Sequence, residues 1–182
     1  AIFGYGNSGS NSSITNLVNS SGVVAANTTG VGTARNSLAA ATYGFDKAIF
    51  GYGDDGSVSS LTNLVNNSGV VAADVTGVGT ARNTPAACGY GSDKAIFGYG
   101  YSGGYVSLTN LVSNSGVVSA DVTGVGTARS RIAAATYGGD KGIFGYGQGS
   151  NLSMTNLVSN SGVVASDTSG VGTARRGLAA AS

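Results

Sequence analysis

Short apolar stretches recur along this chain, and glycine, serine, asparagine or aspartate separates each from the next. In the second copy of the pattern, β-branched, aromatic and small residues fill the stretches at 47–52, 61–66, 70–73 and 85–90. Runs of about five or six residues at such spacings predict short β-strands. The alanine-rich stretch at 38–41 also suits a helix, but its neighbours confine it to about seven residues, too few for a stable isolated helix. The pattern therefore predicts an all-β protein.

The strand pattern occurs four times. The phrase FGYG…TNLV…GVV…GVGTAR begins at Phe3, Phe50, Phe97 and Phe144, so that successive copies are 47 residues apart. Tandem units of this length bury their apolar faces against their neighbours and are typical of propellers and related arrays. Four antiparallel strands per unit form the blade of a β-propeller. We expect a single β-propeller domain over residues 1–182, with repeats at 1–47, 48–94, 95–141 and 142–182.

The two ends of the chain carry complementary parts of one unit. The chain opens with a strand that holds FGYG and closes with an alanine-rich strand at 178–181. We expect these strands to pair and complete a blade, because pairing removes two exposed sheet edges. Closure within one chain gives a monomeric ring of four four-stranded blades, whereas closure between two chains gives a homodimer in which each chain is half of an eight-bladed ring. Small alanine side chains suit a narrow axis and favour four blades.

After Arg82, the chain runs through a small-residue strand and a Gly-Tyr-Gly turn to Lys-Ala-Ile-Phe-Gly-Tyr-Gly and a variable loop, and the other copies follow this order closely. This order resembles kelch-type β-propeller repeats, and the resemblance extends over the whole chain. The units are also similar to recently amplified repeat units of phage and bacterial surface structural proteins. This similarity implies a binding or structural role outside the cytoplasm, on an extracellular or virion surface.

The composition limits the chemistry that the chain can perform. It has no histidine, no glutamate and a single cysteine, although acid–base and nucleophilic catalysis and zinc sites draw mainly on these residues. We therefore expect no enzyme, no catalytic residue, no metal and no cofactor, and we expect Cys88 to be a small buried apolar residue. A net charge of +1 without a basic stripe disfavours nucleic-acid binding. No apolar run approaches the ~18 residues of a membrane span.

The loops that differ most between copies follow the FGYG strands, at 7–13, 54–60, 101–107 and 148–153. Antiparallel topology predicts that they share one rim, and loops on a rigid scaffold commonly carry binding function. Neutral drift in solvated loops would produce the same divergence. The expected partners are proteins of a larger assembly or a surface glycan, so the chain is interpreted as a structural or adhesive module, with a lectin-like or an engineered propeller as alternatives. The candidate ligand-binding residues are Tyr101, Tyr105, Asp54, Asp55, Gln148, Arg131 and Arg176.

An arginine ends the phrase GVGTAR in every copy. One interpretation is structural, because a guanidinium has five donors that can satisfy carbonyls or an aspartate of a neighbouring unit. The other is a cationic ring at the mouth of a central channel, which could hold an anion. The structural interpretation is favoured. These arginines are Arg35, Arg82, Arg129 and Arg175.

Overall fold

The computed structural model describes all residues from 1 to 182 and contains eleven β-strands and no helix, so it has no helix that could cross a membrane. The strands form one two-stranded and three three-stranded antiparallel sheets, which confirms the all-β prediction. The strands are β1 (Ile2–Asn7), β2 (Asn11–Leu17), β3 (Ala39–Tyr43), β4 (Lys47–Gly51), β5 (Thr62–Val65), β6 (Ala86–Tyr90), β7 (Lys94–Tyr101), β8 (Tyr105–Val112), β9 (Ala133–Tyr137), β10 (Lys141–Gly147) and β11 (Leu152–Val158).

The first sheet joins β1 and β2, the second β3 to β5, the third β6 to β8 and the fourth β9 to β11. The first strand of each three-stranded sheet is rich in alanine and comes from the end of one repeat, whereas the other strands come mainly from the next. We call these first strands, β3, β6 and β9, the inner strands. No repeat therefore completes a sheet by itself. The predicted strands at 47–52, 61–66 and 85–90 correspond to β4, β5 and β6.

A fourth segment follows the outer strand of each sheet, but it forms single bridges instead of a continuous strand. In the second sheet, Val71 bridges Val65 and Val75 bridges Thr62. Between these bridges, the side-chain amide of Asn63 donates to the carbonyl of Ala72 at 3.1 Å. A side chain thus replaces a backbone ladder bond at this point, and the strand predicted at 70–73 is reduced to isolated bridges.

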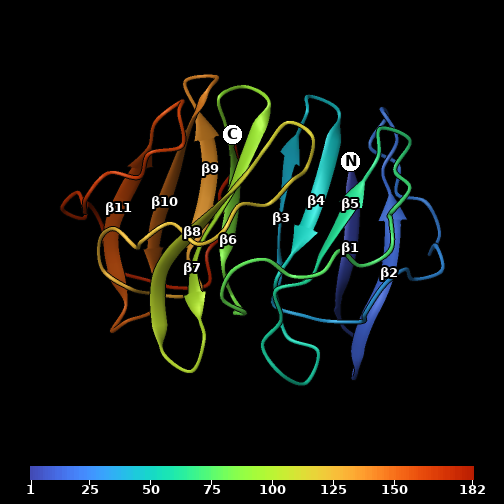
Figure 1. Ribbon diagram of the computed structural model, residues 1–182, viewed down its shortest axis with the longest axis horizontal. Coiled ribbons are helices and arrows are strands. Elements are labelled where there is room, and N and C mark those ends of the chain that lie inside the picture. The colour runs from blue at the N-terminus through green and yellow to red at the C-terminus, as the bar shows by residue number, and fades with distance from the viewer.

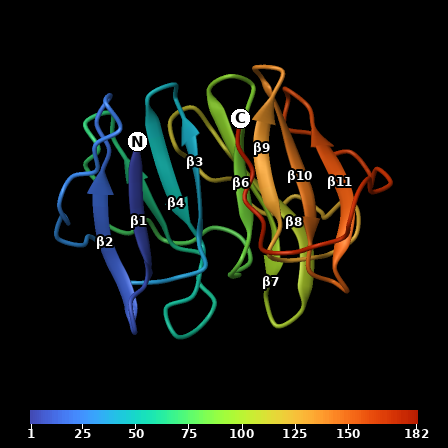
Figure 2. The same cartoon turned by 180° about the vertical axis from the view of Figure 1, so that it is seen from behind.

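The four sheets follow one another in a row, and the first and fourth lie at opposite ends of the longest axis of the molecule (Figure 1). Figure 2 shows the inner strands β3, β6 and β9 between these ends. β1 pairs with β2 alone, and residues 178–182 belong to no strand. The pairing expected between the C-terminal segment and the N-terminal strand is therefore not present. The C-terminal segment instead lines a shallow groove with Ala41, Cys88 and Ala135 of the three inner strands.

Successive sheets are joined by a phenylalanine that packs on the preceding sheet. The ring of Phe144 lies 5.2 Å from the ring of Tyr99, in an edge-to-face arrangement, and is fully buried. A Cβ on Gly98 would lie 2.7 Å from the ring of Phe144, so only glycine allows this approach. The same spacing of 5.2 Å separates Phe50 from Tyr5 and Phe97 from Tyr52. We call each such contact a junction; the three junctions join the four sheets.

The tyrosine of each FGYG phrase adopts a left-handed backbone conformation, with φ between 61° and 64°. The register of the hairpin shifts at this point, for example between Gly98 and Gly100, which is the signature of a β-bulge. This conformation is unfavourable for a bulky side chain and persists where the surrounding structure requires it. In Tyr52 and Tyr99 it turns both the ring and the carbonyl into junctions. The four residues are Tyr5, Tyr52, Tyr99 and Tyr146.

The burial predicted for Cys88 is confirmed, because this residue of β6 is only 5% exposed. Burial raises the pKa of its thiol to about 12, so almost no thiolate exists at neutral pH. We expect the native protein not to react with a thiol reagent such as Ellman's reagent at neutral pH, and the urea-unfolded protein to release one equivalent of chromophore. Rapid reaction of the native protein would contradict the burial of this side chain.

Candidate functional site

The four divergent hairpin loops lie on the same rim of the molecule, along the lower edge of Figure 1. They connect β1 to β2, β4 to β5, β7 to β8 and β10 to β11. The turns between the inner strands and the FGYG strands lie at the opposite rim (Figure 1). We call the rim with the divergent loops the variable rim.

Two tyrosines form an exposed aromatic pair on the variable rim. Tyr101 ends β7, Tyr105 begins β8, and the two are direct cross-strand partners. Their ring centroids are 5.8 Å apart at an angle of 74°, and the residues are 40% and 41% exposed. Such a pair presents apolar ring faces and hydroxyl groups together, which suits contact with a protein or a sugar.

Both aspartates of the second loop form hydrogen bonds within that loop, and Asp54 also binds a residue outside it. The carboxylate of Asp54 accepts hydrogen bonds from the amide of Gly56 and from Nδ2 of Asn83, both at 3.0 Å. The carboxylate of Asp55 accepts from the amide and the hydroxyl of Ser57, both at 3.3 Å. These contacts are those of aspartates that shape a turn, and no group of three or more histidine, cysteine or acidic residues that could hold a metal ion is present.

The remaining candidates lie near the fourth sheet. The backbone of Gln148 exchanges hydrogen bonds with Ser130 at 2.7 and 3.1 Å. Arg131 and Arg176 are both exposed, and the amide of Gly177 donates to the carbonyl of Arg131 at 3.0 Å. The structure therefore brings the two arginines near each other, whereas Tyr101 and Tyr105 belong to the third sheet.

Three of the four repeated arginines are buried in the junctions. Arg35 is fully buried, and its guanidinium carbon lies 4.5 Å from the ring centroid of Tyr5 in the first sheet. It donates to the second sheet, from Nε to the carbonyl of Tyr52 at 2.8 Å and from Nη2 to Oδ1 of Asn63 at 2.6 Å. The arginine thus joins two sheets by stacking on one and binding the other.

Arg82 and Arg129 repeat this arrangement at the second and third junctions. Both are fully buried, with the guanidinium carbon 3.9 and 4.3 Å from the centroid of the stacked ring. These contacts favour the structural interpretation of the three arginines. Arg175 differs, because it stacks on Tyr146 at 4.3 Å but is exposed and donates only to the carbonyl of Thr173.

An aspartate completes each junction. Asp74 accepts from the amide and the hydroxyl of Thr33 across the first junction, at 2.9 and 2.7 Å, and from Nδ2 of Asn63 at 2.9 Å. Burial acts to raise the pKa of this carboxyl group, but the hydrogen bonds and the charge of Arg35 outweigh it and hold the pKa below its ordinary value of 3.8. The same causes lower the pKa of the corresponding aspartates, Asp121 and Asp167.

Acid is expected to weaken the junctions. Because the pKa of each of these carboxyl groups is lower in the folded chain, its stabilisation is complete above the ordinary value of 3.8 and is lost as the pH falls through the folded-state value. Urea unfolding from about pH 5 down to pH 2 should therefore show a falling free energy of unfolding, and a smaller fall for Asp121→Asn. An equal fall in the variant would show that the Asp121 carboxylate does not contribute to the effect.

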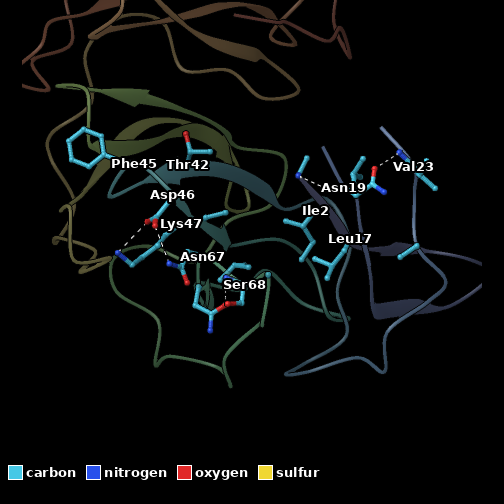
Figure 3. A pocket seen from close by; sticks show the side chains of 17 residues that line it. Ile2, Leu17, Asn19, Val23, Thr42, Phe45, Asp46, Lys47, Asn67 and Ser68 are labelled. Carbon is cyan, nitrogen blue, oxygen red and sulfur yellow. Dashed lines mark hydrogen bonds and ion pairs between the residues drawn. The ribbon is translucent and has the colours of Figure 1, made fainter. Parts of the chain in front are cut away.

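A cleft of about 560 Å³ lies between the first and second sheets and was not predicted from the sequence. Ile2 and Leu17 line it from the first sheet, and Thr42 and Lys47 from the second (Figure 3). At the next two junctions, a tyrosine at the end of an inner strand occupies the corresponding space. This tyrosine packs against a turn of the following sheet; the two residues are Tyr43 and Tyr90. The first sheet has no inner strand, so this tyrosine is missing and the cleft remains. The phase of the repeats was the signal that could have located it.

Comparison with known proteins gives no matching family model and no matching curated protein.

Proposed function

We propose that this chain is a non-enzymatic β-propeller module that acts as a structural or adhesive protein-interaction unit on an extracellular or virion surface. The observation that supports this proposal most directly is the gathering of all four divergent loops on one rim, above a scaffold whose contacts repeat almost unchanged. Such a division between a uniform scaffold and varied loops suits a binding surface.

The propeller interpretation rests on the inner strands. β3 packs beside β6 and β6 beside β9, and each three-stranded sheet extends outward from its inner strand to a bridged fourth segment. An inner strand, two further strands and an outer segment correspond to a blade. The chain then supplies four blades of a ring, of which the first lacks its inner strand.

The aromatic pair allows a direct test of the variable rim. Labelled protein is applied to the surface of cells or virions of its source, and bound protein is measured by fluorescence. We expect Tyr101→Ser with Tyr105→Ser to reduce binding at least about tenfold, because aromatic anchors dominate most interfaces. Phe45→Ser, which changes an 80% exposed aromatic residue in the turn between β3 and β4, is the matched control. Equal binding by the wild type and the double variant would contradict a role for this rim, and absence of wild-type binding would contradict the adhesive function.

A lectin-like function is the second candidate, and the exposed Tyr101–Tyr105 pair is the observation that favours it. A tyrosine ring offers an apolar face for a sugar ring and a hydroxyl group at its edge. A glycan array should then give hits that Tyr105→Ala abolishes. An array without wild-type hits would eliminate this candidate and leave protein partners.

A further inference from the structure

The fourth sheet presents one half of a junction with nothing packed against it. The guanidinium of Arg175 stacks on the ring of Tyr146, as the arginines of the internal junctions stack on their tyrosines. However, Arg175 donates no hydrogen bond to a neighbouring sheet. A Cβ on Gly145 would meet only the side chain of Thr155, at 3.4 Å, whereas a phenylalanine ring covers the corresponding Gly98. This face therefore has an unoccupied place for an aromatic ring and unused guanidinium donors.

The first sheet presents the other half of a junction. Phe3 is 63% exposed, although the three corresponding phenylalanines are buried. Asn16 donates to Asn27 at 2.9 Å and to the carbonyl of Ala25 at 3.1 Å, in the same arrangement that holds Asn63 and its aspartate at the first internal junction. The acceptor site for an arginine is thus already formed in the first sheet.

The missing inner strand has a counterpart in the chain. Residues 178–182 read Leu-Ala-Ala-Ala-Ser, close to the Leu-Ala-Ala-Ala-Thr at 38–42, but they belong to no strand. β1 pairs only with β2, so its other edge is free, and Ile2 of β1 lines the cleft between the first and second sheets. In the second sheet, Thr42 pairs with Ala48 and Ala39 with Gly51. The same register would set Ser182 opposite Ala1 and Ala179 opposite Gly4.

We propose that a second copy of this chain docks head-to-tail, so that Phe3 of one copy covers Gly145 and Tyr146 of the other and Arg175 binds Asn16 across the new junction. The C-terminal segment 178–182 of each copy then becomes the inner strand of the first sheet of the other. Two such contacts, related by a twofold axis, close a ring and leave no unpaired end.

A second copy fits better than the chain's own ends. The three internal junctions share one ring spacing of 5.2 Å, and this repeated packing leaves the first and fourth sheets at opposite ends of the molecule (Figures 1 and 2). Because both end faces match an interface that already occurs inside the chain, a second copy satisfies them without altering any internal junction. Docking of a second copy through the end sheets is independent of what the variable rim binds.

Sedimentation equilibrium of the 182-residue chain tests the association, and we expect twice the monomer mass. Gly145→Ala should restore the monomer mass, because its Cβ occupies the place of the incoming ring, while its far-UV circular dichroism should be unchanged. Arg176→Ala, adjacent to Arg175 but outside the junction, is the matched control and should remain dimeric. A monomeric wild type, or a dimeric Gly145→Ala variant, overturns the proposal.

A disulfide distinguishes a second copy from closure within one chain. In a Cys88→Ala background, Ala1→Cys and Ser182→Cys place one thiol on each partner of the expected pair. Oxidation should give a covalent dimer on a non-reducing gel. A monomer with an internal disulfide, or a ladder of larger species, overturns the proposal in favour of self-closure or an open filament.

One substitution should strengthen the association. Asn27 stands where the internal junctions carry Asp74, Asp121 and Asp167. Asn27→Asp keeps the shape of the side chain and provides a charged acceptor for Arg175 and Thr173 of the other copy. We expect the dissociation constant of the dimer to fall roughly tenfold. An unchanged or larger dissociation constant contradicts this docking geometry.

Discussion

Arg82→Ala is expected to lower the free energy of unfolding by about 3–5 kcal/mol, which is a large share of the stability of a typical domain. Arg82 is fully buried at the central junction, where it donates to the carbonyl of Tyr99 at 2.8 Å and to Oδ1 of Asn110 at 2.7 Å. Both acceptors would remain buried without a donor, at about 1–3 kcal/mol each. Equilibrium urea unfolding, followed by circular dichroism, measures the change.

The control for this variant is Arg176→Ala. Arg176 is exposed and lies outside every internal junction, so its loss should change the free energy of unfolding by no more than about 0.5 kcal/mol. Both variants remove one positive charge, and their comparison separates the buried contacts from a change in net charge. A loss below about 1 kcal/mol for Arg82→Ala would show that the buried arginine contributes little to the junction.

Phe97→Ala is expected to lower the free energy of unfolding by about 3–5 kcal/mol through loss of packing and the cavity left behind. Phe97 is fully buried, lies 5.2 Å from the ring of Tyr52 and covers Gly51, whose Cβ position is 2.7 Å from its ring. Thermal unfolding and urea unfolding should show the same decrease in the free energy of unfolding. Phe97→Leu should restore part of the stability, because an apolar side chain fills much of the space.

Phe45→Ala is the matched control for Phe97→Ala. Phe45 is 80% exposed, so the same substitution there should change the free energy of unfolding by no more than about 0.5 kcal/mol. Similar losses at both positions would contradict the assignment of Phe97 to a junction and point to a general effect of aromatic content.

Much of the candidate site followed from the sequence. The hairpin order placed all the divergent loops on one rim, because antiparallel strands return to the same edge of a sheet at every second turn. The sequence also selected Tyr101 and Tyr105, although their edge-to-face contact depends on the register of β7 and β8. It could not show that the carboxylates of Asp54 and Asp55 bind their own loop, since a turn-forming aspartate and a ligand-binding one look alike in a sequence.

The junctions were much less predictable. The sequence allowed a structural and an anion-binding interpretation of Arg35, and only burial between two sheets favours the first. The left-handed conformation of Tyr99 opposes its local preference, and it became visible only with the contacts that hold it. Strand periodicity shows which residues share a face, but it does not identify the sheet that the face packs against.

The sequence by itself determined the β-strands, the 47-residue repeat and the complementary phase of the two ends, because short-range alternation and turn chemistry encode these features locally. The tertiary structure decided that the phenylalanines and arginines join successive sheets, and that the first and fourth sheets remain apart. The separation of the end sheets depends on the angle at each of three junctions, and small non-local packing contacts set each of those angles.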